Sequence, residues 1–123
     1  MLNQTIIVGR LVKEPTLKTT ENGHIKSDIT VAVNRSYKNS SGVYDTDFID
    51  CTLWHTVAEN TSEYCNKGDM IGIKGRIQTR MIEDENGNKR KHTEIIGEKI
   101  TFLSSNKEKL EKQEKAKKTS EKK

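Results

Sequence analysis

The segment from Asp47 to His55 restricts the fold more than any other part of the chain, because its side chains separate into two faces. Successive side chains on a β-strand point to opposite sides, so the apolar residues of this segment share one face. They are Ile49, Cys51 and Leu53. The other face is polar in its middle and carries Phe48 and Trp54 at its ends, about 20 Å apart at the rise of a strand. Two rings at that spacing cannot stack on each other, and the pattern indicates a surface that receives two separate nucleobases.

Four further segments have the composition of β-strands, and one has the signature of a short helix. The predicted strands cover residues 3–12, 25–35, 47–55, 70–82 and 91–103. In the helical segment, Thr56 and Glu59 have capping-box spacing, and Gly68 is typical of a helix stop. Three strands, a helix and two strands are the order of an OB-fold, a five-stranded Greek-key barrel. The sequence therefore predicts an all-β barrel with one short helix between strands 3 and 4, with an SH3-like barrel as the alternative.

Charge is distributed unevenly along the 123 residues. Residues 104–123 contain eight Lys and four Glu, which accounts for the whole net charge of +4 and leaves residues 1–103 formally neutral. We therefore predict a folded domain over residues 1–103 and a Lys/Glu-rich tail over 104–123 that is a frayed helix or disordered. Polyanion binding by a neutral domain requires a local basic patch, and the predicted strand 70–82 supplies one. Its even-numbered face carries Lys74, Arg76, Gln78 and Arg80, and its odd-numbered face carries Ile71, Ile73, Ile77 and Met81.

Several function classes are disfavoured by the residues present. The start of the chain lacks a signal peptide, and no segment approaches the ~20 apolar residues of a membrane span, so we expect a cytoplasmic protein with reduced Cys51 and Cys65. His24, His55 and His92 fall on three separate segments with no nucleophile or carboxylate set around them. Cys51 and His55 are about 13 Å apart on a strand, too far to bind one ion. We expect no enzyme activity, no metal site and no cofactor.

Many short motifs occur in an order that resembles a known family. They are Met1-Leu2-Asn3, Val8-Gly9-Arg10-Leu11, Glu14-Pro15, Asn22-Gly23, Ala32-Val33-Asn34-Arg35, Asp47-Phe48-Ile49, Ser62-Glu63-Tyr64, Lys67-Gly68 and Gly75-Arg76-Ile77-Gln78-Thr79-Arg80. Together they cover residues 1 to about 103, and this part of the chain resembles the bacterial single-stranded DNA-binding proteins, which are homotetrameric OB-fold proteins. The resemblance implies binding of single-stranded DNA without strong sequence preference during replication, recombination and repair. It also implies a nucleoid-associated location.

The resemblance implies particular site residues. Base-stacking positions of the family correspond to Tyr37, Phe48 and Trp54, and a fourth family aromatic falls on Ile82. Phosphate contacts of the family correspond to Lys18, Lys67 and Arg80, and the strand faces add Arg35, Lys74 and Arg76. In the family the first strand pairs between subunits, which implies a subunit interface that includes Asn3, Thr5, Ile7 and Arg10.

The tail departs from the family pattern, in which an acidic tip recruits replication and repair enzymes. Residues 106–123 contain no Gly, no Pro and no acidic tip, so recruitment through a tip is not expected, and a plasmid, phage or other mobile-element origin is open. The tail either keeps the protein soluble or binds DNA weakly. The alternative function is an OB-fold protein-interaction module of the primosomal replication-restart type, with secondary nucleic-acid binding.

Overall fold

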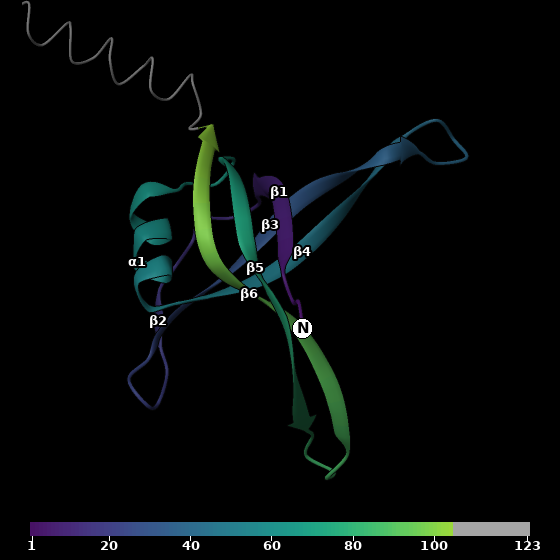
Figure 1. Ribbon diagram of the computed structural model, residues 1–123. Coiled ribbons are helices and arrows are strands. Elements are labelled where there is room, and N and C mark those ends of the chain that lie inside the picture. Colours follow the sequence, from purple (N-terminus) through teal and green to yellow (C-terminus); the bar gives the residue numbers. More distant parts are fainter. Residues whose placement is uncertain (105–123) are drawn as a thin grey trace, which may run out of the picture.

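Five long strands wrap into a barrel in the computed structural model, which describes residues 1–104 (Figure 1). The elements in chain order are β1 (Thr5–Leu11), β2 (Lys18–Thr19), β3 (Ile25–Lys38), β4 (Tyr44–Trp54), α1 (His55–Tyr64), β5 (Met70–Glu83) and β6 (Lys89–Ser104). The five predicted strands and the helix are confirmed, and the two-residue strand β2 was not predicted. The predicted tail lies outside the described residues, apart from Ser104.

The barrel closes because β1 pairs with two strands in succession. The sheet order is β1-β5-β6-β4-β3-β2, and β1 adds a pairing with β3 through Arg10 and Leu11. Gly9 stands where β1 passes from one partner to the other. A Cβ there would lie 2.8 Å from the carbonyl oxygen of Ala32, so only glycine allows this close approach. This five-stranded closure, with the helix after the third long strand, confirms the predicted OB-fold.

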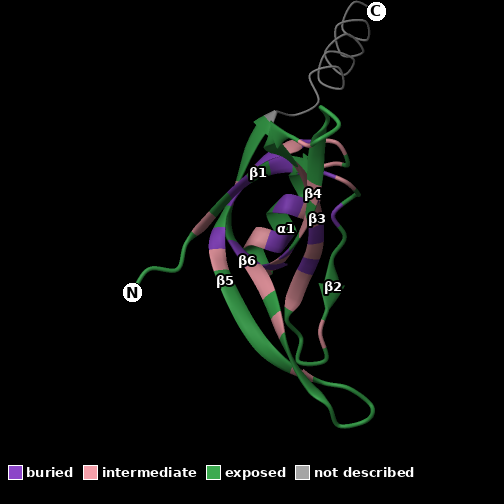
Figure 2. Ribbon diagram, turned by 90° about the vertical axis from the view of Figure 1, so that its right-hand side faces the viewer, coloured by how far each residue is buried: buried purple, intermediate pink, exposed green. Residues whose placement is uncertain are grey.

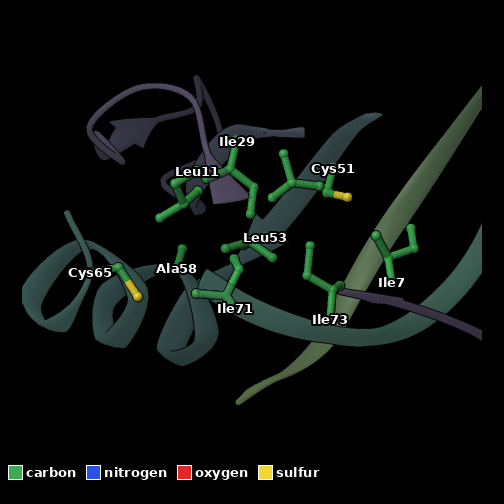
Figure 3. Close-up of a cluster of buried hydrophobic side chains, with 10 residues drawn as sticks. Ile7, Leu11, Ile29, Cys51, Leu53, Ala58, Cys65, Ile71 and Ile73 are labelled. Atoms are coloured by element: carbon green, nitrogen blue, oxygen red, sulfur yellow. The ribbon is translucent and has the colours of Figure 1, made fainter. Parts of the chain in front are cut away.

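The core lies inside the barrel and against α1. Figure 2 looks into the ring of strands, with α1 visible through it and buried residues in purple on the strands and on α1. Figure 3 shows the inward side chains of β1, β3, β4 and β5 meeting Ala58 of α1 and Cys65 just after it. The buried cluster is Ile7, Leu11, Ile29, Val31, Cys51, Leu53, Ala58, Cys65, Ile71 and Ile73. Ile49, Cys51 and Leu53 therefore do face the core, as the alternation predicted, with Ile49 only half-buried.

The ends of α1 differ from the prediction. The helix begins at His55 with Trp54 at the N-cap and no side-chain cap hydrogen bond, so the capping box of Thr56 and Glu59 is wrong. Thr56 is already inside the first turn, where its hydroxyl cannot serve as the cap. At the other end the helix stops at Tyr64, and Gly68 forms the later turn into β5 with φ of 93°. The N–H of Gly68 donates to the carbonyl of Leu11, which ties that turn to β1.

Two hairpins extend beyond the barrel (Figure 1). The β3–β4 hairpin turns at Asn39, whose side-chain oxygen accepts hydrogen bonds from the N–H groups of Ser41 and Val43. In the β5–β6 hairpin, Asp84 accepts from two backbone N–H groups in the same way. The outer half of β5 has left the barrel, so Ile77 and Met81 are exposed, although they were predicted on the apolar face. Within residues 1–104 no helix has the length and apolar character needed to cross a membrane.

Candidate nucleic-acid interface

The outward face of β3 and β4 combines exposed aromatic rings with a polar centre that the chain itself satisfies. Trp54 lies opposite Lys26 and Phe48 lies opposite Ala32 in the antiparallel register, and opposed residues share one face. Phe48 is 66% exposed. Between the two rings, the hydroxyl of Thr30 donates to Asp50 at 2.6 Å. The acidic residues of this face are thus engaged, and the rings stay available.

Trp54 is held at the end of this face by polar and aromatic neighbours. Its ring is half-buried, and the Lys26 ammonium lies 5.7 Å from its centroid, within the range of a cation–π contact. The rings of His24 and His55 also contact it edge-on or tilted. The sequence placed the histidines on three separate segments, and the structure brings two of them, His24 and His55, together because the turn before β3 folds back onto the start of α1. His92 lies apart from them, on β6.

The β3–β4 hairpin carries the third predicted stacking ring and a further ring, Tyr44, that the sequence reasoning placed on this hairpin but not among the stacking residues. Tyr37 is exposed beyond an irregularity in the β3–β4 register between Asn34 and Lys38. Tyr44 is also exposed, and as an even-numbered residue of β4 it shares the side of Phe48 and Trp54. The predicted strand began at Asp47, so Tyr44 was assigned to the projecting hairpin and not to the face of that strand. Extending the alternation three residues would have placed it on the face.

A basic groove of about 460 Å³ runs from this face toward the β5–β6 hairpin. The basic side chains that line the groove are Lys13, Lys18, Lys26, Arg80 and His92. The acidic side chains that line it are Asp28, Asp50 and Glu94. Two predicted phosphate contacts, Lys18 and Arg80, thus meet in one groove although they come from distant segments. Lys13, Lys26 and His92 were missed, because nothing in their local sequence shows that the β5–β6 hairpin lies beside the barrel part of β3 and β4.

The other predicted cations lie elsewhere. Arg35 is held within the β3–β4 hairpin, where its guanidinium binds Asp47 through Nε and Nη2 and lies 3.7 Å from Asp45. This hydrogen bonding holds the pKa of the Asp47 carboxyl below its usual value. Lys67 is exposed in the turn before β5, outside the groove. Lys74 and Arg76 follow the even-numbered face of β5 as predicted, but of that face only Arg80 lines the groove, because the strand twists as it leaves the barrel.

Most of the residues predicted for a subunit interface serve their own chain. The side chain of Asn3 donates to the carbonyl of Ile77 and accepts from its N–H, which fixes the N-terminus to β5. Ile7 is buried in the core, and Arg10 donates to the carbonyl of Gly68. Thr5 is half-buried and pairs with Gly75. The side chains that β1 exposes are Ile6 and Val8.

The thiols are not placed for chemistry. Cys51 borders the groove but is only 2% exposed, and burial, helped by nearby Asp50, raises its pKa to about 11. Burial, with a smaller contribution from Asp69, likewise raises the pKa of Cys65 to about 11. A thiolate is the reactive form, so both side chains are inert near neutral pH. Residues 1–104 also contain no group of three or more His, Cys, Asp or Glu residues that could hold a metal ion.

The closed barrel, the exposed aromatic row and the adjoining basic groove define an OB-fold with the surface features of a nucleic-acid-binding protein. The chain belongs to the Single-strand binding protein family, whose profile matches residues 2–103. It is 47% identical over 103 residues to single-stranded DNA-binding protein B of Bacillus subtilis, covering 84% of this chain and 91% of that protein.

Two further relatives differ in how much of their length is matched. Single-stranded DNA-binding protein 1 of Clostridium acetobutylicum is 39% identical over 108 residues, covering 87% of this chain and 98% of that protein. The single-stranded DNA-binding protein of Bacillus cereus is 43% identical over 103 residues, and there the match spans 84% of this chain but 61% of that protein.

Proposed function

We propose that this protein binds single-stranded DNA along the outward face of β3 and β4 and through the adjoining groove. The observation that carries the proposal is Phe48, a large ring 66% exposed on a strand whose opposite face lies in the core. Bases stack on Phe48, on Trp54 and on the hairpin ring of Tyr37. Stacking is worth about 1–3 kcal/mol per base and tolerates any sequence, since every base has a π-face.

Phosphates are bound mainly by the cations of the groove. Lys18 and Arg80 were predicted for this role, and Lys13, Lys26 and His92 join them there. Arg35 is engaged by carboxylates, and we propose that it shapes the β3–β4 hairpin rather than binding phosphate as its main role. Phosphate contacts from Lys67, Lys74 and Arg76 remain predictions, and they require that the bound DNA strand continues beyond the groove.

The same proposal includes a homotetramer assembled as a dimer of dimers. One edge of β1 pairs with β5 from Thr5 to Arg10, whereas the other edge pairs with β3 only at Arg10 and Leu11. The rest of that edge has no strand partner within residues 1–104, and Ile6 and Val8 are exposed on this strand. Free strand edges invite pairing with a second chain. We therefore propose that Ile6 and Val8, rather than the buried Ile7, supply the apolar part of the subunit contact.

The roles in replication, recombination and repair, and a cytoplasmic, nucleoid-associated location, stay predictions from the family. Partner recruitment concerns the tail, which lies outside the described residues. The family match and the exposed aromatic face favour DNA binding, without enzyme activity, over the alternative of a protein-interaction module.

Replacement of one exposed ring tests the proposal. Phe48→Ala should weaken binding of a short oligo-dT by about 1–3 kcal/mol, roughly five- to 150-fold, because one stacking contact is lost. Its thermal stability should change little, since most of the ring is in solvent. Tyr64→Ala is the matched control, because Tyr64 is 61% exposed but lies on α1 away from the groove. Equal affinities of the two variants in fluorescence anisotropy would refute the assignment of this face.

A further inference from the structure

Two histidines that are 31 positions apart in the sequence lie together beside Trp54. His24 follows the turn between β2 and β3, and His55 is the first residue of α1. Their ring centroids are 5.2 Å apart with the planes at 82°, and each ring centroid lies within 6.5 Å of that of Trp54. We call these three rings the His–Trp–His cluster. It lies at the end of β4 on the proposed stacking face.

The backbone holds His55 in this position. Its φ is 53°, in the left-handed region that residues other than glycine seldom adopt. His55 is the one non-glycine residue with positive φ among the described residues, and it stands where the chain turns from β4 into α1. His24 is fixed from the other side, because its backbone N–H donates to the hydroxyl of Thr20 and its carbonyl accepts from the N–H of Thr20. Both imidazoles are therefore presented by rigid turns.

Charged side chains of both signs lie on the segments that carry the cluster and beside them. Lys26 lies over the Trp54 ring and pairs with Asp28 at 3.3 Å, and Lys18 lies 3.9 Å from the same carboxylate. Glu21 belongs to the turn that precedes His24, and Glu59 follows His55 by one helical turn. These neighbours carry two positive and three negative charges. Two protonated imidazoles would therefore reverse the sign of the local charge, next to a ring that stacks on a base.

We propose that His24 and His55 form a phosphate subsite beside the base stacked on Trp54, which binds the adjoining internucleotide phosphate when the imidazoles are protonated. This inference rests on the proposed function of Trp54. An imidazole changes its charge in the range just below neutral pH and, when protonated, donates from both ring nitrogens. Binding of DNA is thus coupled to uptake of protons at this cluster, and affinity for single-stranded DNA rises as the pH falls.

The experiment compares oligo-dT affinity at about pH 8 and about pH 5.5 for the full chain, a double histidine variant, His24→Lys and Trp54→Ala. The double variant His24→Gln/His55→Asn removes both imidazoles, and Asn is chosen because it tolerates the left-handed backbone of residue 55. His24→Lys supplies a permanent charge. His92, which lines the groove, is present in every variant, so its contribution is common to all of them. Circular dichroism and thermal melts establish that each variant is folded.

When the pH is lowered from about 8 to about 5.5, the affinity of the unmodified chain should rise roughly two- to tenfold more than the affinity of the His24→Gln/His55→Asn double variant. The slope of log affinity against log salt should steepen by about 0.7 for each phosphate gained. His24→Lys should bind at about pH 8 nearly as tightly as the unmodified chain binds at about pH 5.5. An identical pH profile for the double variant overturns the subsite, as does a loss of affinity that is equal at both pH values, which indicates a purely structural cluster. If Trp54→Ala leaves affinity unchanged at both pH values, the stacking role itself fails, a result distinguishable from these.

Discussion

Gly75 permits the close contact between β5 and β6 that shapes the barrel, and its replacement by alanine should be severely destabilising. A Cβ at this position would overlap the carbonyl oxygen of Ile96 and lie 2.9 Å from that carbonyl carbon and 3.1 Å from the Cα of Gly97. All three are backbone atoms of the paired strand, so relief requires that the β5–β6 ladder itself shifts. Overpacking typically costs about 1–3 kcal/mol, and a backbone obstacle places Gly75→Ala at about 3 kcal/mol or above. For a domain of this size, that lowers Tm by about 12 °C or more.

Gly72→Ala on the same strand is the matched control. Its Cβ would meet Leu103 at 3.5 Å and Thr101 at 3.7 Å, which are ordinary van der Waals distances to side chains. Its free energy of unfolding should therefore change by less than about 1 kcal/mol. Urea denaturation followed by Trp54 fluorescence, at one fixed protein concentration, measures both variants. Equal stabilities would refute the described packing of β5 against β6.

Two further predictions concern the thiols and the tail. Because burial raises the pKa of both Cys51 and Cys65 to about 11, from 9.0, the thiolate fraction at pH 8 is about a hundredfold lower in the folded chain than in the unfolded chain. Alkylation should be slower by at least that factor and should accelerate in urea; fast labelling of the folded protein would contradict this. Deleting residues 104–123 should flatten the salt slope of DNA binding by about 0.7 for each phosphate that the tail neutralises, and we expect one or two per subunit. An unchanged slope would assign DNA binding wholly to the barrel.

The fold was predictable where the alternation of apolar and polar side chains lies within one short segment of the chain. The segment 47–55 placed Phe48 and Trp54 opposite the core without any knowledge of the other strands, because a strand's period of two is fixed by backbone geometry. The same rule failed for Ile77 and Met81. Their odd residue numbers placed them on the apolar side of β5. The alternation of side chains does not reveal that the twisted hairpin has already left the barrel at these positions.

Site residues that depend on tertiary contacts were beyond sequence reasoning. Arg35 was predicted to bind phosphate, yet the β3–β4 register brings Asp47 within 3.0 Å of its guanidinium. Lys13 and Lys26 meet Arg80 in one groove only because the β5–β6 hairpin lies beside the barrel part of β3 and β4. His24 and His55 come together for the same kind of reason, since a turn and a helix start meet at Trp54. Pairwise proximity of this sort is set by the closure of the barrel and leaves no periodic signal in the chain.

The central claim is that single-stranded DNA lies along the outward face of β4, and Trp54 gives its most direct test. Trp54 is the single tryptophan of the chain, so its intrinsic emission reports on this position alone. Titration with oligo-dT should quench the emission saturably, with a midpoint that matches the affinity measured independently by anisotropy, and duplex DNA should have little effect. Unchanged Trp54 emission when anisotropy shows the protein saturated with oligo-dT would place the DNA on a different surface and contradict the account.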